Sequence, residues 1–375
     1  MTRNIDLDIL RAYAIIGTFL AHLPNFANVP NSISPIFNAL GWGMGVDIFF
    51  VLSGYLITNS LIHTKAVSAS GALKIFWIKR FWRIVPTSFV WIVAASLISI
   101  LFAHHNDKSG IMGTLWSALA AVFNYANVYW SFCIQGGLVG KTCGGGANMA
   151  VWWSLALEEQ FYLFFPLIFL FFRKQIVLVF AASIIVYFVF NPRFFANIHW
   201  MMRADGLAAG VILAFIMNSK AYSKRLKLQS GVMAKMIGHA CLLGVFIAGG
   251  LAYRVPDLNP LFFSLAVLLA ALCIFIASQN VGAYQLPVLK HILNWIGLIS
   301  FSFYLSHESV LVLSEQLANY IMPLNKNVKF LFVATSSFAF SMLFASLSYR
   351  WLEGPLMKLG SRQARSPQTF SPASF

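Results

Sequence analysis

The sequence GWGMGVDIFFVLSGYLIT at residues 41–58 is a long apolar run that holds one acid, Asp47, and four glycines. A helix that spans a membrane needs about 20 mostly apolar residues. The glycines let neighbouring helices approach closely in lipid, and packing alone would account for them. A buried carboxylate, by contrast, is costly unless a partner stabilises it. The run therefore predicts a transmembrane helix in which Asp47 has a partner, and His22 is expected at a similar depth.

The composition extends this interpretation to the whole chain. Of the 375 residues, 59% are apolar and 10% are charged, against roughly 45–50% and about 25% in soluble domains. An ordinary soluble protein is therefore excluded, and a mean hydropathy of +0.76 excludes a disordered chain. The 26 Lys and Arg against 11 Asp and Glu leave a formal charge of +15. We expect no nucleic-acid partner, because membrane insertion selects basic residues for cytoplasmic loops.

Apolar stretches long enough to span a membrane predict an all-α polytopic protein. The first stretch is not expected to be a cleavable signal peptide, because Arg11 interrupts it and no small-x-small site follows. The eleven candidate stretches are 7–23, 40–62, 84–103, 111–130, 151–172, 175–190, 200–218, 235–252, 260–278, 293–313 and 328–349.

The distribution of basic residues decides whether 111–130 crosses the membrane. If it does not cross and the N-terminus is cytoplasmic, nineteen of the 26 Lys and Arg lie inside, six lie in outer loops, among them Arg193, and Arg203 lies within a span. If it did cross, twelve of those nineteen would move outside. Because basic residues favour the cytoplasmic side, we expect about ten transmembrane helices, both termini in the cytoplasm, and 111–130 outside or re-entrant.

The chain is expected to form one transmembrane domain at 1–350. A cytoplasmic tail at 351–375 is basic and then rich in Ser and Pro, so its end is expected to be disordered. We find no convincing internal repeat, which weakens the case for a transporter built from duplicated halves.

Ionisable residues inside the predicted spans form one layer in the outer half of the membrane. Residues near a span's end can simply snorkel to the headgroups, but snorkelling does not explain why they all share one side. Intramembrane charges usually mark function, so this layer is a candidate site. Its members are His22, Asp47, Glu158, Glu159, Arg203, Asp205, His307 and Glu308.

Arg11 and His22 connect this layer to the cytoplasmic side. They are eleven residues apart, which places both on one face of a helix, about 16 Å apart along its axis. An arginine can hold an anion, whereas a histidine can accept and return a proton near neutral pH. We therefore expect anion binding at Arg11 and proton transfer at His22, and we interpret the isolated His239 as structural.

The segment KIFWIKRFWRIVP at residues 74–86 places Arg80 and Arg83 one helical turn apart. One interpretation is a cytoplasmic anchor with an aromatic belt. The other is a phosphate-binding site, because one guanidinium group can donate two hydrogen bonds to two phosphate oxygens at once. The sequence leaves both interpretations open.

These motifs together resemble the acyltransferase 3 family of integral membrane acyltransferases, which includes bacterial O-antigen and exopolysaccharide acetylases. The resemblance covers almost the whole chain in the family's order. It rests on LRAYAIIGTFLAHL (10–23), GVDIFFVLSGYLIT (45–58), KRFWRIVP (79–86), WWSLALEEQFYLFFP (152–166), RADGLAAGVILA (203–214), IGLISFSFYLSHESV (296–310) and YRWLEGPL (349–356).

The resemblance implies a bacterial inner-membrane enzyme that moves an acyl group, most often acetyl, from cytoplasmic acetyl-CoA to a hydroxyl of an extracytoplasmic glycan. The acceptors that it suggests are lipopolysaccharide O-antigen, exopolysaccharide and lipid-linked sugar. Many relatives carry an additional SGNH domain after the last helix; this chain stops short of one, which looks like the stand-alone form. In SHES at 306–309 an aromatic residue and a proline of the family pattern are missing, which puts the role of His307 in doubt.

The residue roles follow from the resemblance and from the two charge layers. Acyl-CoA phosphates are expected to bind Arg11, Lys79, Arg80 and Arg83. His22 is expected to deprotonate the acceptor or to carry the acyl group for one step, with Asp47 or Glu158 orienting its ring. The candidate substrate-binding residues are Glu159, Arg203, Asp205 and His307. No metal is expected.

Two rival functions remain open at this stage. In a transporter or flippase for a lipid-linked sugar, the same acids and histidines would act as a proton relay. In a structural membrane subunit, they would have no chemical role. Arginines near the inner face with a base near the outer face favour the enzyme, because donor and acceptor then approach from opposite sides.

Four cysteines without a CxxC pair exclude a zinc module and a dense disulfide framework. Cys133 and Cys143 lie ten residues apart in a glycine-rich segment on the predicted outer side, where disulfides persist. We therefore expect a disulfide between them, with two free thiols as the alternative.

Overall fold

The computed structural model describes residues 3–64, 68–102, 108–138, 143, 149–195, 197–220, 228–321 and 326–364, and within these residues the regular elements are helices without strands. The longer helices are α1 (Ile5–His22), α3 (Gly45–Ile62), α4 (Ala69–Phe102), α5 (Lys108–Val122), α6 (Ala126–Gln135), α7 (Trp152–Phe171), α8 (Lys174–Phe190), α10 (Asp205–Met217), α11 (Val232–Arg254), α12 (Asn259–Ser278), α13 (Lys290–Leu298), α14 (Ser300–Ile321), α15 (Lys326–Ser348) and α16 (Gly354–Gln363). Shorter elements are α2 (Ser34–Ala39), α9 (Ile198–Met201), the 3-10 turns Leu23–Asn25, Trp42–Met44 and Pro256–Leu258, and a π-helical turn at Tyr349–Glu353.

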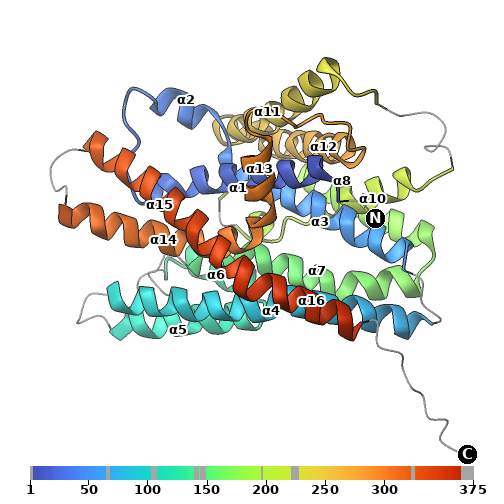
Figure 1. Cartoon of the computed structure of the whole chain (residues 1–375), viewed down its shortest axis with the longest axis horizontal. Coiled ribbons are helices and arrows are strands. Elements are labelled where there is room, and N and C mark those ends of the chain that lie inside the picture. The colour runs from blue at the N-terminus through green and yellow to red at the C-terminus, as the bar shows by residue number, and fades with distance from the viewer. Residues whose placement is uncertain are drawn as a thin grey trace, which may run out of the picture.

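The prediction of an all-α polytopic membrane protein is confirmed. Within the described residues, eight helices are long and apolar enough to cross a membrane, or nine if the bent pair α13 and α14 counts as one span. The apolar helices α5 and α8 are shorter. Most of the long helices run side by side, and α1 begins and α16 ends at the same end of the bundle, on the right in Figure 1. Because α1 begins and α16 ends at one end of the bundle, the described helices between them cross it an even number of times, which agrees with the expectation of both ends on one side.

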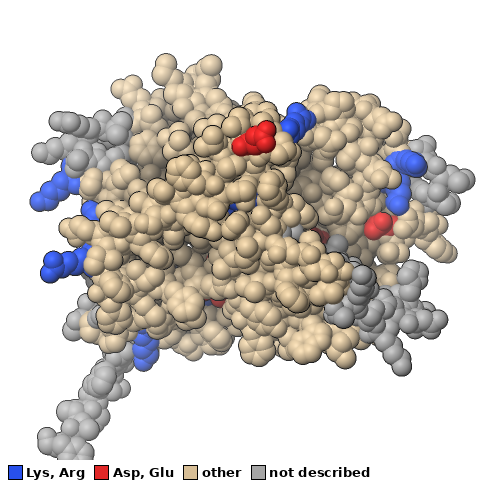
Figure 2. All heavy atoms as spheres, turned by 180° about the vertical axis from the view of Figure 1, so that it is seen from behind, with Lys and Arg blue, Asp and Glu red and all other residues tan. Residues whose placement is uncertain are grey.

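The surface agrees with a lipid environment. Figure 2 shows a broad face with almost no charged residues, on which the few Lys, Arg, Asp and Glu lie mainly near the edges. Large apolar side chains such as Leu101, Phe190 and Leu331 are more than half exposed along the helices. An apolar exterior of this kind is expected where lipid, and not water, is the solvent.

Three predicted spans differ from the observed helices. Residues 84–102 of the stretch 84–103 are the second part of α4, which begins at Ala69 and continues through Pro86. The stretch 293–313 is two helices, α13 and α14, that meet at 80°. The bend lets α13 lie across α1, where a side chain at Gly297 would come within 1.8 Å of the Asp8 carbonyl oxygen. Only glycine fits that contact.

The stretch 111–130 is also broken, into α5 and α6, with Asn124 at a φ of 55° between them. Gln160 of α7 holds the break: its Nε2 donates to the Asn124 carbonyl at 2.8 Å and to Asn127 Oδ1 at 3.0 Å. Non-helical backbone at membrane depth needs such protein partners. The chain folds back after α5, so that the Tyr129 hydroxyl of α6 donates to the Gly113 carbonyl of α5 at 3.4 Å. This arrangement agrees with the re-entrant alternative of the sequence analysis.

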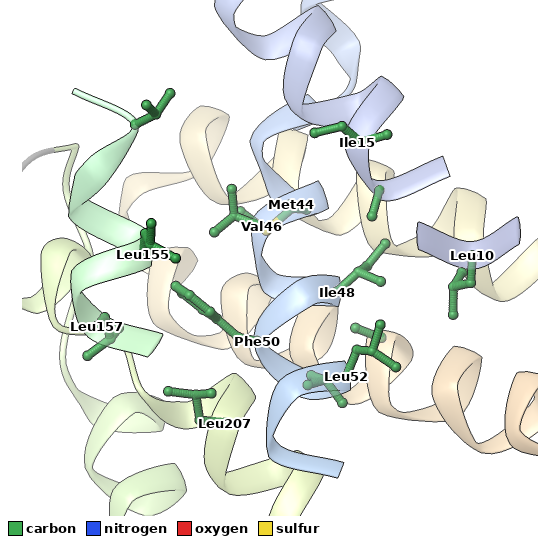
Figure 3. Close-up of a cluster of buried hydrophobic side chains, with 14 of the residues drawn as sticks. Leu10, Ile15, Met44, Val46, Ile48, Phe50, Leu52, Leu155, Leu157 and Leu207 are labelled. Atoms are coloured by element: carbon green, nitrogen blue, oxygen red, sulfur yellow. The ribbon is translucent and has the colours of Figure 1, made fainter. Parts of the chain in front are cut away.

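The helix α3, which contains the run 45–58, lies at the centre of the bundle. A side chain at Gly54 would come within 2.1 Å of the Leu207 carbonyl oxygen on α10, and one at Gly45 within 2.2 Å of the Ala14 carbonyl oxygen on α1. The packing role of these glycines is therefore confirmed. Figure 3 shows the buried apolar side chains that α3 presents to its neighbours.

At the end of the chain, residues 351–363, which the sequence analysis assigned to the tail, continue the last helix through the π-helical turn into α16. This helix packs on α4, where Trp82 Nε1 donates to Gln363 Oε1 at 2.6 Å. Residues 365–375, for which disorder was expected, lie outside the described residues.

Candidate functional site: two cavities along one bundle

A cavity of about 100 Å³ lies between α1, α3, α4, α7 and α14, and we call it the inner cavity. Three of its lining residues are arginines, Arg11, Arg80 and Arg83, and one is an acid, Glu158. The structure therefore brings together the arginines that the sequence analysis grouped. Lys79, which it grouped with them, is exposed and does not line this cavity. A lysine next to Arg80 in a helix points to a different face.

Contacts within the protein hold the inner arginines only in part. The Arg80 guanidinium lies 5.1 Å from the centre of the Tyr162 ring and 5.6 Å from that of Phe76. Arg11 Nη1 donates to Asp8 Oδ1 at 3.0 Å. No ion pair within 4 Å joins Arg80 or Arg83 to an acid in the described part of the chain. Positive charge is thus held at this cavity without full neutralisation.

A larger cavity of about 390 Å³ lies toward the other end of α1, and we call it the outer pocket. His22, Glu308 and Arg203 line it. Aromatic side chains supply much of the remaining wall, namely Phe37, Trp42, Trp130, Trp153, Phe195, Trp200 and Tyr253. A mostly apolar pocket with a few convergent polar groups is typical of a ligand site.

His22 is oriented by Glu308, with a hydrogen bond between Nδ1 and the carboxylate. A carboxylate accepts, so Nδ1 carries the proton and Nε2 is left to accept one. The expectation that Asp47 or Glu158 orients His22 is therefore wrong for this structure. The reason is that Arg203 holds the Asp47 carboxylate, while Glu158 lines the inner cavity.

His307 packs against His22, with 5.1 Å between the ring centres. Its Nδ1 bonds to the Tyr304 carbonyl at 2.7 Å, and its buried Nε2 has no partner among the described residues. Ligand atoms of His22, His307 and Glu308 lie within 4.8 Å of one another, a spacing that a metal ion could use. The pairing of His22 with Glu308 is explained by hydrogen bonding alone, and the expected absence of a metal stays a prediction.

Asp47 is held by Arg203, which donates from Nε at 3.0 Å and from Nη2 at 3.1 Å. The Arg203 guanidinium also lies 4.2 Å from the centre of the Trp200 ring and 4.8 Å from that of Trp153. The prediction that Asp47 has a buried partner is confirmed, but the partner is Arg203 and not His22. A two-fold contact of this kind fixes α3 to the start of α10.

Asp205 pairs with Arg193, which donates from Nη1 at 2.6 Å. The sequence analysis placed Arg193 in an outer loop, yet the structure buries it completely. Neither Arg193 nor Asp205 lines the inner cavity or the outer pocket. The candidate substrate-binding role of Asp205 therefore has no support from the geometry.

Glu158 and Glu159 face different surroundings. Glu158 lines the inner cavity and accepts from the Tyr162 hydroxyl at 2.7 Å. Glu159 lines a separate small cavity between α4, α5 and α7, together with Ser88 and Trp152. Consecutive helical residues point about 100° apart, which explains the different surroundings. Neither glutamate lines the outer pocket that contains His22.

Besides Arg203 as the partner of Asp47, sequence reasoning missed three partners. Glu308 was noted for its depth but not as the partner of His22, Asp8 was not connected to Arg11, and Arg193 was counted as a loop charge. The i, i+3 spacing of Asp8 and Arg11 is a signal that was available in the sequence. The contact of His22 with Glu308 joins two helices, and that of Arg193 with Asp205 joins a loop to a helix. No local pattern links either pair.

A disulfide joins Cys133 and Cys143. Cys133 lies on α6, one turn after Trp130, which lines the outer pocket. The expected disulfide is therefore present, and it restrains the helix that supplies part of this pocket.

The sequence was compared with protein families and with known proteins. The model of the acyltransferase domain family matches residues 4–347. Peptidoglycan O-acetyltransferase OatA of Listeria monocytogenes is 29% identical over 95% of this chain and 56% of its own length. O-acetyltransferase OatA of Staphylococcus aureus is 28% identical over 94% of this chain and 57% of its own length.

The chain thus spans about half the length of these relatives. No solved structure matches it. The family match covers nearly the whole chain and includes both cavities, and the apolar helices place the protein in a membrane. The chain is a multi-pass cell-membrane protein that belongs to the acyltransferase family.

Proposed function

We propose that the protein is an O-acetyltransferase that takes an acetyl group from cytoplasmic acetyl-CoA and transfers it to a hydroxyl of an extracytoplasmic glycan. The observation that carries the proposal is the pair of cavities. A cationic cavity and an aromatic pocket with a histidine lie at successive depths and share one wall residue, Val46. A donor and an acceptor that approach from opposite sides need this arrangement.

The inner cavity suits the donor. Arg80 and Arg83, which form no ion pair among the described residues, are available to phosphate groups, and Arg11 lies beside them although it is paired with Asp8. Charge-assisted bonds to phosphate are strong hydrogen bonds. The pantetheine arm of CoA is long and uncharged, so it can extend between the apolar side chains Phe49, Leu52 and Leu155 that line the same cavity. Its thioester would then approach the outer pocket from the side of the inner cavity.

The outer pocket suits a glycan acceptor. Sugar rings present apolar C–H faces that pack on aromatic rings, and the pocket supplies Trp42, Trp153 and Trp200 for that contact. The buried indole N–H of Trp130 has no partner among the described residues, so it can donate to a sugar oxygen. Peptidoglycan, which the name of the Listeria relative specifies, is the first acceptor to test, followed by O-antigen, exopolysaccharide and lipid-linked sugar.

Transfer would proceed through His22. Its Nε2 takes the proton of the acceptor hydroxyl, the hydroxyl oxygen bonds to the thioester carbon, and the carbon–sulfur bond breaks. The proton then passes from His22 to the CoA thiolate, which leaves as the thiol. In the alternative order, His22 attacks first and holds the acyl group until the hydroxyl displaces it. In both routes Glu308 stabilises the charged imidazole.

The rival transporter interpretation has less support. A proton relay needs acids that are free to exchange protons, whereas Asp47 and Asp205 are held in buried ion pairs.

The test uses the purified full chain in liposomes with radiolabelled acetyl-CoA and a panel of envelope glycans. Label should reach at least one glycan, and His22→Ala should abolish that transfer. A wild-type protein that binds acetyl-CoA but labels no glycan would argue against the acceptor class. A protein that does not bind acetyl-CoA would overturn the donor assignment.

A further inference from the structure

The inner cavity and the outer pocket meet at one level of the bundle. Val46 of α3 lines both. On α7 the residues on the two sides are consecutive, with Ser154 in the inner cavity and Trp153 in the outer pocket. On α14 they are one turn apart, with Tyr304 on the inner side and Glu308 on the outer side. The partition between the cavities is therefore about one side chain thick.

A hydrogen bond closes this partition. The hydroxyl groups of Tyr304 and Ser154 lie 2.5 Å apart and join α14 to α7. The Tyr304 hydroxyl also donates to the Val151 carbonyl at 3.1 Å. Val46 is 6% exposed, and Figure 3 shows that it points from α3 toward α7, on the same side of the helix as Phe50. Three helices thus contribute one side chain each to the partition.

The partition also lies next to the reactive histidine. The Tyr304 ring contacts the His307 ring with 5.6 Å between centres, and His307 contacts His22. A thioester carbon within reach of a hydroxyl bound at His22 must therefore lie at the level of Val46 and Tyr304. The acyl substituent on that carbon has to fit among the same side chains.

We propose that Val46, together with the hydrogen-bonded pair Tyr304 and Ser154, forms a constriction that sets the length of the acyl group. This inference rests on the proposed function. A methyl group fits beside Val46, while each further methylene must displace part of the partition. Packing of one methylene is commonly worth a factor of about 10–200 in specificity, so a single valine is sufficient to separate acetyl from longer acyl donors.

The proposal concerns selectivity, so the decisive measurement is a ratio. Wild type, Val46→Ala and Val46→Phe are compared in liposomes with acetyl-, propionyl- and butyryl-CoA, both for transfer and for binding by calorimetry. Val46→Ala removes two methyl groups and should raise the butyryl-to-acetyl transfer ratio by about tenfold or more. Val46→Phe should block transfer from acetyl-CoA while free CoA still binds.

Val211→Ala is the matched control. Val211 is 1% exposed, lies on α10 and lines neither cavity, so the same atoms are lost away from the partition and the ratio should not change. Tyr304→Phe and Ser154→Ala each remove the closing bond and should shift the ratio in the same direction as Val46→Ala, by about two- to tenfold.

The outcomes separate the two proposals. If wild type transfers acetyl but Val46→Ala keeps the wild-type ratio, the constriction is overturned and the proposed function stands. If Val211→Ala shifts the ratio equally, loosened packing is the cause and the constriction is again overturned. If wild type neither binds nor transfers any acyl-CoA, the proposed function fails and the constriction fails with it.

Discussion

The inner and outer halves of the bundle differ in whether their arginines form ion pairs. In the outer half, Arg203 is paired with Asp47 and Arg193 with Asp205, and all four side chains are buried. In the inner half, Arg80 and Arg83 line a cavity without an ion pair among the described residues. A buried pair fixes helices to one another, whereas an unpaired cluster keeps its charge for a ligand. Charge alone would have made the two sets look alike.

The largest expected effect tests the chemistry of the outer half. His22→Ala should lower transfer by roughly 10²–10⁴-fold, because a general base is lost, while acetyl-CoA binding and membrane insertion persist. Transfer is measured in liposomes and binding by calorimetry. His239→Ala is the control: His239 contacts Tyr13 and lines neither cavity, so it should be close to wild type. Near-normal transfer by His22→Ala would refute the role of this base.

The second prediction separates structural from ligand-binding arginines. Asp47→Asn and Arg203→Met should each lower the free energy of unfolding by about 3–5 kcal/mol, because each leaves a buried charge without its partner. The double variant Asp47→Asn with Arg203→Met should lose much less than the sum of the two single losses. Arg83→Ala should leave unfolding nearly unchanged. Denaturant unfolding in detergent micelles measures all four, and additive losses in the double variant would contradict the pairing.

The disulfide tests which half faces outward. Cys133→Ser with Cys143→Ser should lower the free energy of unfolding by about 2–4 kcal/mol, because a closed loop constrains the unfolded chain. A membrane-impermeant maleimide added to intact cells should label the wild type only after reductant. Labelling without reductant would exclude the bridge in the membrane. Labelling only after permeabilisation would place these cysteines inside and reverse the two halves.

The smallest effect concerns the inner half. Arg80→Ala and Arg83→Ala should each weaken acetyl-CoA binding by about 1.5–3 kcal/mol, the contribution of a hydrogen bond to a charged group. Lys79→Ala is the matched control, because Lys79 carries the same charge on the neighbouring exposed face. Calorimetry measures the three affinities. Equal affinities in all of them would leave the two arginines as a topological anchor only.

Local patterns in the sequence were sufficient to predict the fold class and the relative positions of Arg11 and His22 along one helix. Apolar length predicted the spanning helices because every backbone group in lipid must be bonded within a helix. The spacing of Arg11 and His22 predicted that they lie at different depths on one face of a single helix, because helix geometry is fixed. In the structure Arg11 lines the inner cavity and His22 lines the outer pocket. The glycines of 41–58 predicted close helix packing, because small residues let neighbouring helices approach closely in lipid.

Only the tertiary structure decided which charges pair. His22 and Glu308 are 286 residues apart, and Asp47 and Arg203 are 156 apart, so their contacts depend on which helices become neighbours. The breaks at Asn124 and between α13 and α14 likewise depend on Gln160 and on the α1 backbone. A buried charge or a broken helix in lipid is stable only with a partner. The partner is set by packing, which the periodicity of one segment does not encode.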